Sequence, residues 1–140
     1  MRQVLDRYGM GDCNPTKLPL AHGTQFSLSD EPSFPPTPEA ITDFRGKIGS
    51  VIYAMKQIRL DIAYTVGVLA KHMSNPGPNH IKALHHLFRY LKGTQNHGLT
   101  FVGKKRLEIK GFCDASYNSS PLTTESVTGW VTTVGGTALS

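Results

Sequence analysis

Hydrophobic positions recur at helical spacing in residues 60–94, and this stretch has the strongest pattern in the chain. In its second half the apolar residues fall three or four positions apart, which predicts an amphipathic helix. These residues are Ile81, Leu84, Phe88 and Leu91. In its first half we expect a second helix, which Asp61 caps and the turn-forming residues 74–78 end. The apolar faces of two helices joined by so short a corner should pack as an αα-hairpin.

The predicted second helix also carries basic side chains on a different face, at Lys82, His86 and Arg89. One interpretation is a packed scaffold whose cations point into water. The other is a track for a nucleic-acid backbone, because phosphate attraction requires little more than clustered cations. The candidate contacts, besides Lys71, are Lys82, Arg89, Lys92, Lys104, Lys105 and Arg106.

A third core helix is predicted from Thr42, which can cap it. The apolar residues on one face of this helix are Phe44, Ile48, Val51, Met55 and Ile58. The preceding residues 16–41 are rich in Pro, Ser and Thr, which predicts an exposed, irregular linker. Residues 1–15 are expected to form a short helical entry segment that stops at Gly9 and Gly11.

Beyond Gly93 the period changes from helical to alternating, which predicts strands. One pair of strands is expected to begin at Leu99 and to turn at residues 103–106. Another is expected to run over residues 127–134 and to turn at the Gly-Gly pair 135–136, which is a two-residue hairpin signature.

This change of period predicts an α+β fold. We expect a small helical bundle over residues 42–94 and an incomplete antiparallel sheet over residues 95–140, preceded by the entry segment and the linker. With 140 residues and 39% hydrophobic content, the chain has the size of one domain with a modest core.

The net charge, the two cysteines and the absence of long apolar runs indicate which partners and which cellular compartment to expect. A net charge of +5 and a pI near 9.4 favour anionic partners such as nucleic acid, although such a charge is also ordinary for solubility. Cys13 and Cys113 are far apart and have no metal-ligand spacing, which fits a reducing, intracellular environment in the cytoplasm or nucleus. The chain start lacks the pattern of a secretory signal, and no apolar run reaches membrane-spanning length, so no membrane partner is expected.

Several motifs together resemble the Pol polyprotein of copia-type retrotransposons, from the end of reverse transcriptase into the start of ribonuclease H. Residues 44–53 are similar to the family's YRSxxGSLxY motif, residues 59–63 (RLDIA) resemble RPDI, and residues 88–94 (FRYLKGT) resemble RYLKGT. Residues 4–15 look like the segment downstream of the polymerase palm. The resemblance covers nearly the whole chain, and it implies that residues 42–94 form a thumb-like region.

The last third continues the resemblance. Residues 111–115 (GFCDA) resemble the family's GYCDAD strand, which implies that Asp114 is a metal ligand in a truncated ribonuclease H-like sheet. Ser116 stands where a second Asp is usual, Leu60 replaces the family's Pro, and Thr124-Glu125 replaces a basic pair. A two-magnesium site requires several carboxylates. We therefore expect an incomplete, catalytically silent site without a bound cofactor, in which Asp114 is vestigial or simply forms a turn, although the parent family uses magnesium.

The resemblance implies that the remaining ribonuclease H acids would lie beyond the last residue and the polymerase carboxylates before the first. The expected function is that of a retrotransposon-derived reverse transcriptase and ribonuclease H fragment that binds RNA or DNA weakly and without specificity.

Fragments of this kind also resemble the RxLR-class effectors that downy mildews secrete. That alternative implies secretion, delivery into a host cell, host plant proteins as partners and suppression of plant cell death. The sequence itself has no Arg-x-Leu-Arg tetrapeptide, the nearest text being residues 59–61. The effector function is therefore kept as the alternative.

Overall fold

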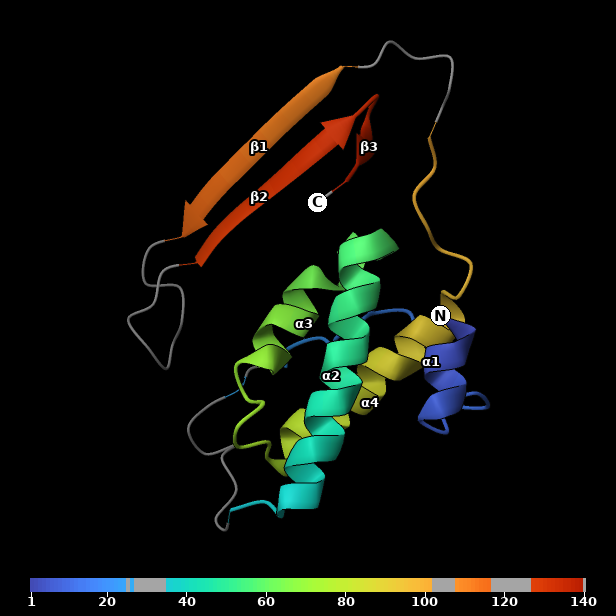
Figure 1. Cartoon of the computed structure of the whole chain (residues 1–140), viewed down its shortest axis with the longest axis vertical. Coiled ribbons are helices and arrows are strands. Elements are labelled where there is room, and N and C mark those ends of the chain that lie inside the picture. Colours follow the sequence, from blue (N-terminus) through green and yellow to red (C-terminus); the bar gives the residue numbers. More distant parts are fainter. Residues whose placement is uncertain (25, 27–34, 102–107, 117–126, 140) are drawn as a thin grey trace.

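The computed structural model describes residues 1–24, 26, 35–101, 108–116 and 127–139. Helices occupy the lower part of the molecule and a sheet lies above them (Figure 1). The helical elements are α1 (Arg2–Arg7), α2 (Pro38–Ile58), the 3₁₀ turn η2 (Leu60–Ile62), α3 (Ala63–Ala70) and α4 (Pro78–Gly93). The strands are β1 (Ile109–Ser116), β2 (Val127–Val134) and β3 (Thr137–Ala138). The predicted α+β class is confirmed.

One hydrophobic core joins the helices, and its buried residues all come from the first 91 positions. The apolar faces predicted for α2 and α4 are confirmed at most of their positions. The most buried apolar side chains are Leu5, Phe44, Ile48, Val51, Ile62, Val66, Leu69, Leu84, Leu87, Phe88 and Leu91. Burying apolar side chains of this size supplies the main driving force for packing the helices together.

The first turn of α4 differs from the prediction. Ile81 is 37% exposed, whereas His80 is fully buried. The helix begins at Pro78, and the His80 Nδ1 atom accepts a hydrogen bond of 2.8 Å from the Gly77 N–H, which would otherwise lack an intrahelical partner. The inward position in this turn therefore belongs to a residue that caps the helix rather than to an apolar one.

Helix α2 begins earlier than predicted, and Thr42 does not cap it. Thr37 is the N-cap residue, and its Oγ1 atom accepts a hydrogen bond of 3.3 Å from the Ala40 N–H. Pro38 occupies the first helical position, where a missing N–H costs nothing and a fixed φ favours the helix. Thr42 lies inside the helix, where its hydroxyl donates to the Pro38 carbonyl.

Residues 10–24 together with Phe26, here called the arm, lie partly within the range predicted as an exposed linker. Residues 16–24 are irregular, as predicted, but the exposed-linker interpretation is wrong for part of them. Phe26 is buried in the core, and Leu20 packs against the core. The physical reason is that apolar side chains between the prolines find a hollow beside α4, so the segment folds back onto the helices.

The sheet is antiparallel, with strand order β1-β2-β3. The hairpin predicted at the Gly-Gly pair is confirmed: Val134 pairs with Thr137, and Gly135 and Gly136 have φ values of +57° and +86°. Positive φ at both turn positions is what a two-residue turn between twisted strands requires. A strand predicted from Leu99 is wrong, because residues 97–101 are irregular, and the predicted turn at 103–106 lies outside the described residues.

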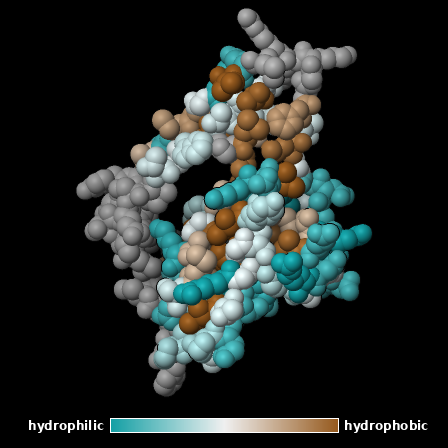
Figure 2. Space-filling model, viewed as in Figure 1, coloured by the Kyte–Doolittle hydropathy of each residue, from teal (hydrophilic) through white to brown (hydrophobic). Residues whose placement is uncertain are grey.

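The strands do not share the helical core. Ile109, Phe112 and Trp130 are 72%, 57% and 66% exposed, and Figure 2 shows apolar residues at the surface in the upper part of the molecule. The helical core therefore holds the lower part together without the sheet.

Candidate nucleic-acid interface

The end of α4 meets the segment after α2 through a buried arginine. Arg59 is 1% exposed, and its Nε and Nη2 atoms donate to the two carboxylate oxygens of Asp61 at 2.9 and 2.8 Å. The Arg59 Nη1 and Nη2 atoms also donate to the carbonyl and hydroxyl oxygens of Thr94, at 3.0 and 2.7 Å. The Tyr90 hydroxyl donates to the Asp61 carboxylate at 2.7 Å. A two-point guanidinium–carboxylate pair of this kind fixes orientation as well as distance.

The charges in this cluster shift the pKa of each member. Burial raises the pKa of Asp61, but hydrogen bonds from Arg59 and Tyr90 outweigh it, and the pKa lies below its usual value. Burial lowers the pKa of Arg59, yet the hydrogen bond and charge of Asp61 leave it above its usual value. Burial and the bond to Asp61 raise the pKa of Tyr90. The cluster therefore holds Arg59 and Asp61 charged and Tyr90 neutral at physiological pH.

This cluster overturns the predicted role of Asp61 as a helix cap. Residue Ile62 occupies the N-cap position of α3, and it makes no side-chain cap hydrogen bond. Asp61 lies in the 3₁₀ turn η2 instead. A carboxylate two residues from a buried guanidinium is stabilised more by that charge than by backbone N–H groups.

The C-terminal part of α4 also contacts the arm. The Arg89 Nε atom donates to the Asn14 carbonyl at 2.7 Å, and the Lys92 Nζ atom donates to the Gly11 carbonyl. The Thr16 N–H donates to the Arg89 carbonyl at 3.3 Å. A Cβ atom on Gly93 would lie 3.0 Å from the Pro15 Cβ, so the arm approaches the helix at a position where only glycine fits without displacement. We call these contacts the arm clasp.

The structure therefore divides the predicted cation stripe. Arg89 and Lys92 belong to the arm clasp, whereas Lys82 is exposed. The predicted contacts Lys104, Lys105 and Arg106 lie outside the described residues. His86 faces the arm, with its Nε2 atom 3.0 Å from the Leu18 carbonyl oxygen. Three of the six predicted nucleic-acid contacts lie in the described part of the chain, and Lys82 is the one of these three that is not in the arm clasp.

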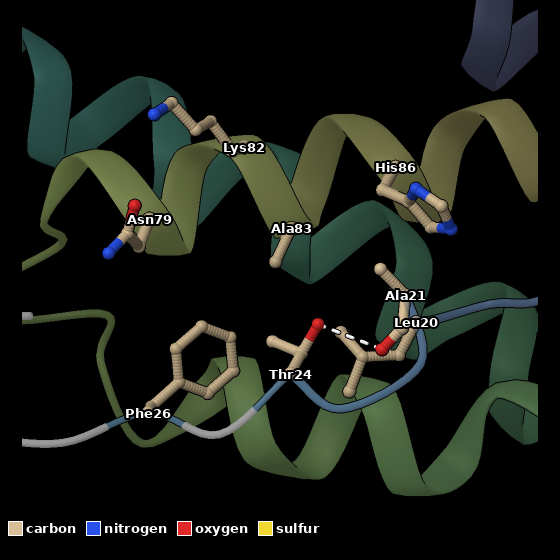
Figure 3. Close-up of a pocket in the computed structure, with 8 residues that line it drawn as sticks. All are labelled: Leu20, Ala21, Thr24, Phe26, Asn79, Lys82, Ala83 and His86. Carbon is tan, nitrogen blue, oxygen red and sulfur yellow. Dashed lines mark hydrogen bonds between the residues drawn. The ribbon is translucent and has the colours of Figure 1, made fainter.

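Lys82 stands at the edge of a groove between the arm and α4, here called the arm groove (Figure 3). Its volume is about 250 Å³. Its lining residues are Leu20, Ala21, Thr24, Phe26, Asn79, Lys82, Ala83 and His86. Figure 3 shows Ala83 pointing from α4 toward Thr24, whose hydroxyl donates to the Ala21 carbonyl at 2.8 Å. Apolar and polar side chains thus line the groove together, and Lys82 is the one cation among them.

Asp114 lies in β1 opposite Gly129 and is exposed. Within the described residues no three His, Cys, Asp or Glu side chains come together as a metal ion would require. Glu108, which comes directly before β1, forms an ion pair of 3.2 Å with Lys110 instead. None of the helices in the described ranges is long and apolar enough to cross a membrane.

Comparison with known proteins identifies the family. The chain is 34% identical, over its whole length, to the retrovirus-related Pol polyprotein from transposon TNT 1-94 of Nicotiana tabacum. It is 32% identical over 99% of its length to the uncharacterized mitochondrial protein AtMg00810 of Arabidopsis thaliana. Over 66% of its length it is 33% identical to the secreted RxLR effector protein 161 of Plasmopara viticola. No family model matches the sequence, and no solved structure matches the chain.

The chain belongs to the retrovirus-related Pol polyproteins of copia-type transposons. It spans 11% of the length of the tobacco polyprotein, 55% of the mitochondrial protein and 66% of the effector. The motif resemblance found in the sequence is therefore confirmed at the level of the family.

The Arg59 cluster was not predicted from the sequence. Arg59 and Thr94 are 35 residues apart, and helical periodicity gives no information about a contact across that separation. The available signal was that Arg59 and Asp61 lie in one of the family-like motifs and Tyr90 and Thr94 in another. Two polar motifs that flank apolar helices are candidates for mutual contact.

Proposed function

We propose that this chain is the part of a Pol polyprotein in which the end of reverse transcriptase passes into the start of ribonuclease H, and that it binds RNA or DNA weakly without sequence preference. The observation that carries the proposal is the 34% identity to a transposon Pol polyprotein over the whole chain. The contact between the two family-like motifs, through Arg59 and Thr94, supports it because it gives those motif residues a role in holding the helical region together.

The nucleic-acid contacts proposed are phosphate contacts. Lys82 is exposed, whereas Arg89 and Lys92 are half-buried, and the basic run 104–106 supplies further cations. Arg89 uses its Nε atom in the arm clasp, which leaves a guanidinium with further N–H donors for an anion. Lys92 has a smaller role, because its ammonium group already donates to the arm. Such contacts provide affinity without reading sequence.

Charge reversal tests these contacts. Lys82→Glu, alone and together with reversal of residues 104–106, should weaken binding to a short single-stranded oligonucleotide at low salt. Lys56→Glu on α2 serves as the matched control, because it makes the same charge change at an exposed position outside the stripe. Equal weakening by the control would point to net charge alone and would count against the stripe.

We also propose that the chain does not act as a nuclease, with Asp114 as a vestigial metal ligand of a ribonuclease H-like strand. The support is that a two-metal site requires several converging carboxylates, and Asp114 is exposed beside Gly129. The purified chain should leave an RNA–DNA hybrid intact in magnesium or manganese. Cleavage that disappears in Asp114→Asn would refute this part of the proposal.

The secreted-effector alternative rests on the 33% identity to the effector of Plasmopara viticola. It proposes that the helical region has been reused as a surface that contacts host plant proteins. Expression of the chain in leaf tissue should then reduce induced cell death. Unchanged cell death, at a protein level confirmed by immunoblot, would reject the alternative and leave the Pol-segment proposal in place.

A further inference from the structure

We infer that the arm competes with nucleic acid for the basic face of α4, and that a nucleic-acid backbone binds this face fully only after it displaces the middle of the arm, residues 11–19. The inference rests on the proposed nucleic-acid binding and adds to it a competition within the chain. Two of the predicted phosphate contacts, Arg89 and Lys92, are half-buried in the arm clasp. Displacing the arm would make both of them available to phosphates.

Basic side chains at three-residue intervals along α4 each meet a backbone carbonyl oxygen of the arm. The pairs are His86 with Leu18 at 3.0 Å, Arg89 with Asn14 at 2.7 Å, and Lys92 with Gly11. The arm therefore runs antiparallel to α4 along this face. A carbonyl oxygen accepts hydrogen bonds from cations as a phosphate oxygen does, but it has no net charge. The backbone of the arm thus occupies positions that suit the phosphate oxygens of a nucleic acid.

The arm does not neutralise the cations that it covers. Over residues 10–24 the single acid, Asp12, is balanced by Lys17, so the arm brings no net negative charge to α4. A hydrogen bond between a cation and a phosphate joins two charged groups, and is therefore stronger than one between the same cation and a neutral carbonyl. Phosphate binding also releases counterions from the nucleic acid, which favours association. Each contact with Arg89 or Lys92 is therefore more favourable for a phosphate than for the arm.

Polar contacts rather than burial hold the middle of the arm on α4. Among residues 11–19, all of which the structure describes, no side chain belongs to the hydrophobic core, whereas Met10 and Leu20 on either side pack against it. Segments with few buried apolar contacts open at a low cost in free energy. Gly9 and Gly23 flank the segment with φ values of +65° and +74°, and small residues at such points absorb backbone rotation. The middle of the arm can thus leave α4 while Met10 and Leu20 stay packed.

Gly93→Val tests the inference, because a branched side chain there meets the Pro15 Cβ and displaces the arm. The measurement is the salt dependence of binding of a short oligothymidine by the full chain. Release of the arm should raise the affinity at low salt and make the slope of log association constant against log salt steeper by at least about 0.7, the value for one added phosphate contact on a single strand. Gly67→Val has open space around its Cβ position and should keep the slope of the unmodified chain.

The slopes separate this inference from the proposed function. Equal slopes for Gly93→Val and the unmodified chain would overturn the inference and leave the proposed function standing. No detectable binding by either protein at low salt would overturn both. If hydrogen exchange shows that Gly93→Val leaves the arm in place or loosens α2, Thr16→Pro replaces it with the same expected slope, because it removes the N–H that donates to the Arg89 carbonyl.

A second substitution locates the added contact. In the Gly93→Val background, Lys92→Gln should make the slope shallower by about 0.7, because it removes one cation that the arm has released. Lys56→Gln, which removes a cation at an exposed position of α2, should leave the slope unchanged. A slope that Lys92→Gln does not alter would mean that cations elsewhere provide the gain, and it would overturn the assignment to the arm clasp.

The unmodified chain provides a reciprocal test. If the nucleic-acid backbone and the arm compete for α4, each must weaken the binding of the other. Saturating oligothymidine should therefore speed hydrogen exchange of the Thr16 amide, whose N–H donates to the Arg89 carbonyl at 3.3 Å. Unchanged or slower exchange at Thr16 would show that the strand binds while the arm stays in place, and it would overturn the inference whatever the variants do.

Discussion

Arg59 and Asp61 form a two-point ion pair across a single intervening residue, with the guanidinium 1% exposed and the carboxylate 37% exposed. This difference in exposure determines how much unfolding free energy is lost when either residue is replaced. A buried charge that loses its partner remains buried, whereas a partly exposed charge can turn to water.

Asp61→Asn should therefore destabilise the chain strongly. The variant leaves the buried Arg59 without its counter-charge and leaves a single side-chain oxygen at position 61 to accept from Arg59 and Tyr90. We expect a loss of about 2–4 kcal/mol in the free energy of unfolding, a value below that for a fully buried pair because Asp61 is partly exposed. Chemical denaturation measures it. Asp43→Asn is the control, since its ion pair with Lys47 is a surface pair on α2, and a comparable loss there would contradict the special role of the Arg59 cluster.

The same cluster predicts how stability depends on pH. The pKa of Asp61 is lowered on folding, so the unfolded state binds more protons and stability rises with pH through this range. The advantage of the unmodified chain over Asp61→Asn should be complete above about pH 5 and should shrink as pH falls below the ordinary Asp pKa of about 3.9. Unfolding free energies of both proteins across this range provide the test. A difference that stays constant down to pH 2 would contradict the coupling.

Gly93→Val should displace the arm. A Cβ atom at this position meets the Pro15 Cβ at 3.0 Å and the Thr16 carbonyl oxygen at 3.3 Å, so a branched side chain cannot fit unless the arm moves. Hydrogen exchange in residues 11–24 should become faster, while exchange in α2 stays slow. Gly67→Val is the matched control, because nothing lies within 4 Å of a Cβ atom there. Unchanged protection of the arm in Gly93→Val would show that the arm clasp does not hold it.

Phe26→Ala should cost about 3 kcal/mol in the free energy of unfolding, as is typical when a buried phenylalanine is truncated. Leu18→Ala in the same arm should change it by less than about 0.5 kcal/mol, because Leu18 is 52% exposed. Equal effects of the two substitutions would mean that the arm is not anchored by Phe26.

Local signals predicted the parts of the fold that local interactions decide. The Gly135–Gly136 turn needs positive φ at both residues, and the stripe from Leu84 to Leu91 needs only helical periodicity, so both were predicted. The start of α2 at Pro38 was missed because the proline-rich composition around it predicted irregular structure. The arm clasp was missed for a different reason. Arg89 and Lys92 donate to backbone carbonyls of Asn14 and Gly11. Every residue has such a carbonyl, so the sequence does not indicate which ones accept these hydrogen bonds.

Contacts with the arm also explain why the predicted basic residues of α4 differ in their availability. From spacing alone, Lys82 and Arg89 are equivalent members of one basic face. The structure distinguishes them, because Arg89 bonds to the arm and Lys82 remains exposed. Contacts with distant backbone groups thus decide which predicted site residues are available to a ligand. Sequence periodicity gives no information about such contacts.

The most direct test of the proposed function is the salt dependence of oligonucleotide binding by the full chain. If phosphate contacts carry the affinity, the logarithm of the association constant should fall linearly with the logarithm of salt concentration, with a slope of about −0.7 for each phosphate neutralised on a single strand. Lys82→Glu should make that slope shallower by about 0.7, which corresponds to the loss of one phosphate contact, whereas Lys56→Glu should not change it. An affinity that stays constant between low and physiological salt, or a slope that Lys82→Glu leaves unchanged, would contradict the account.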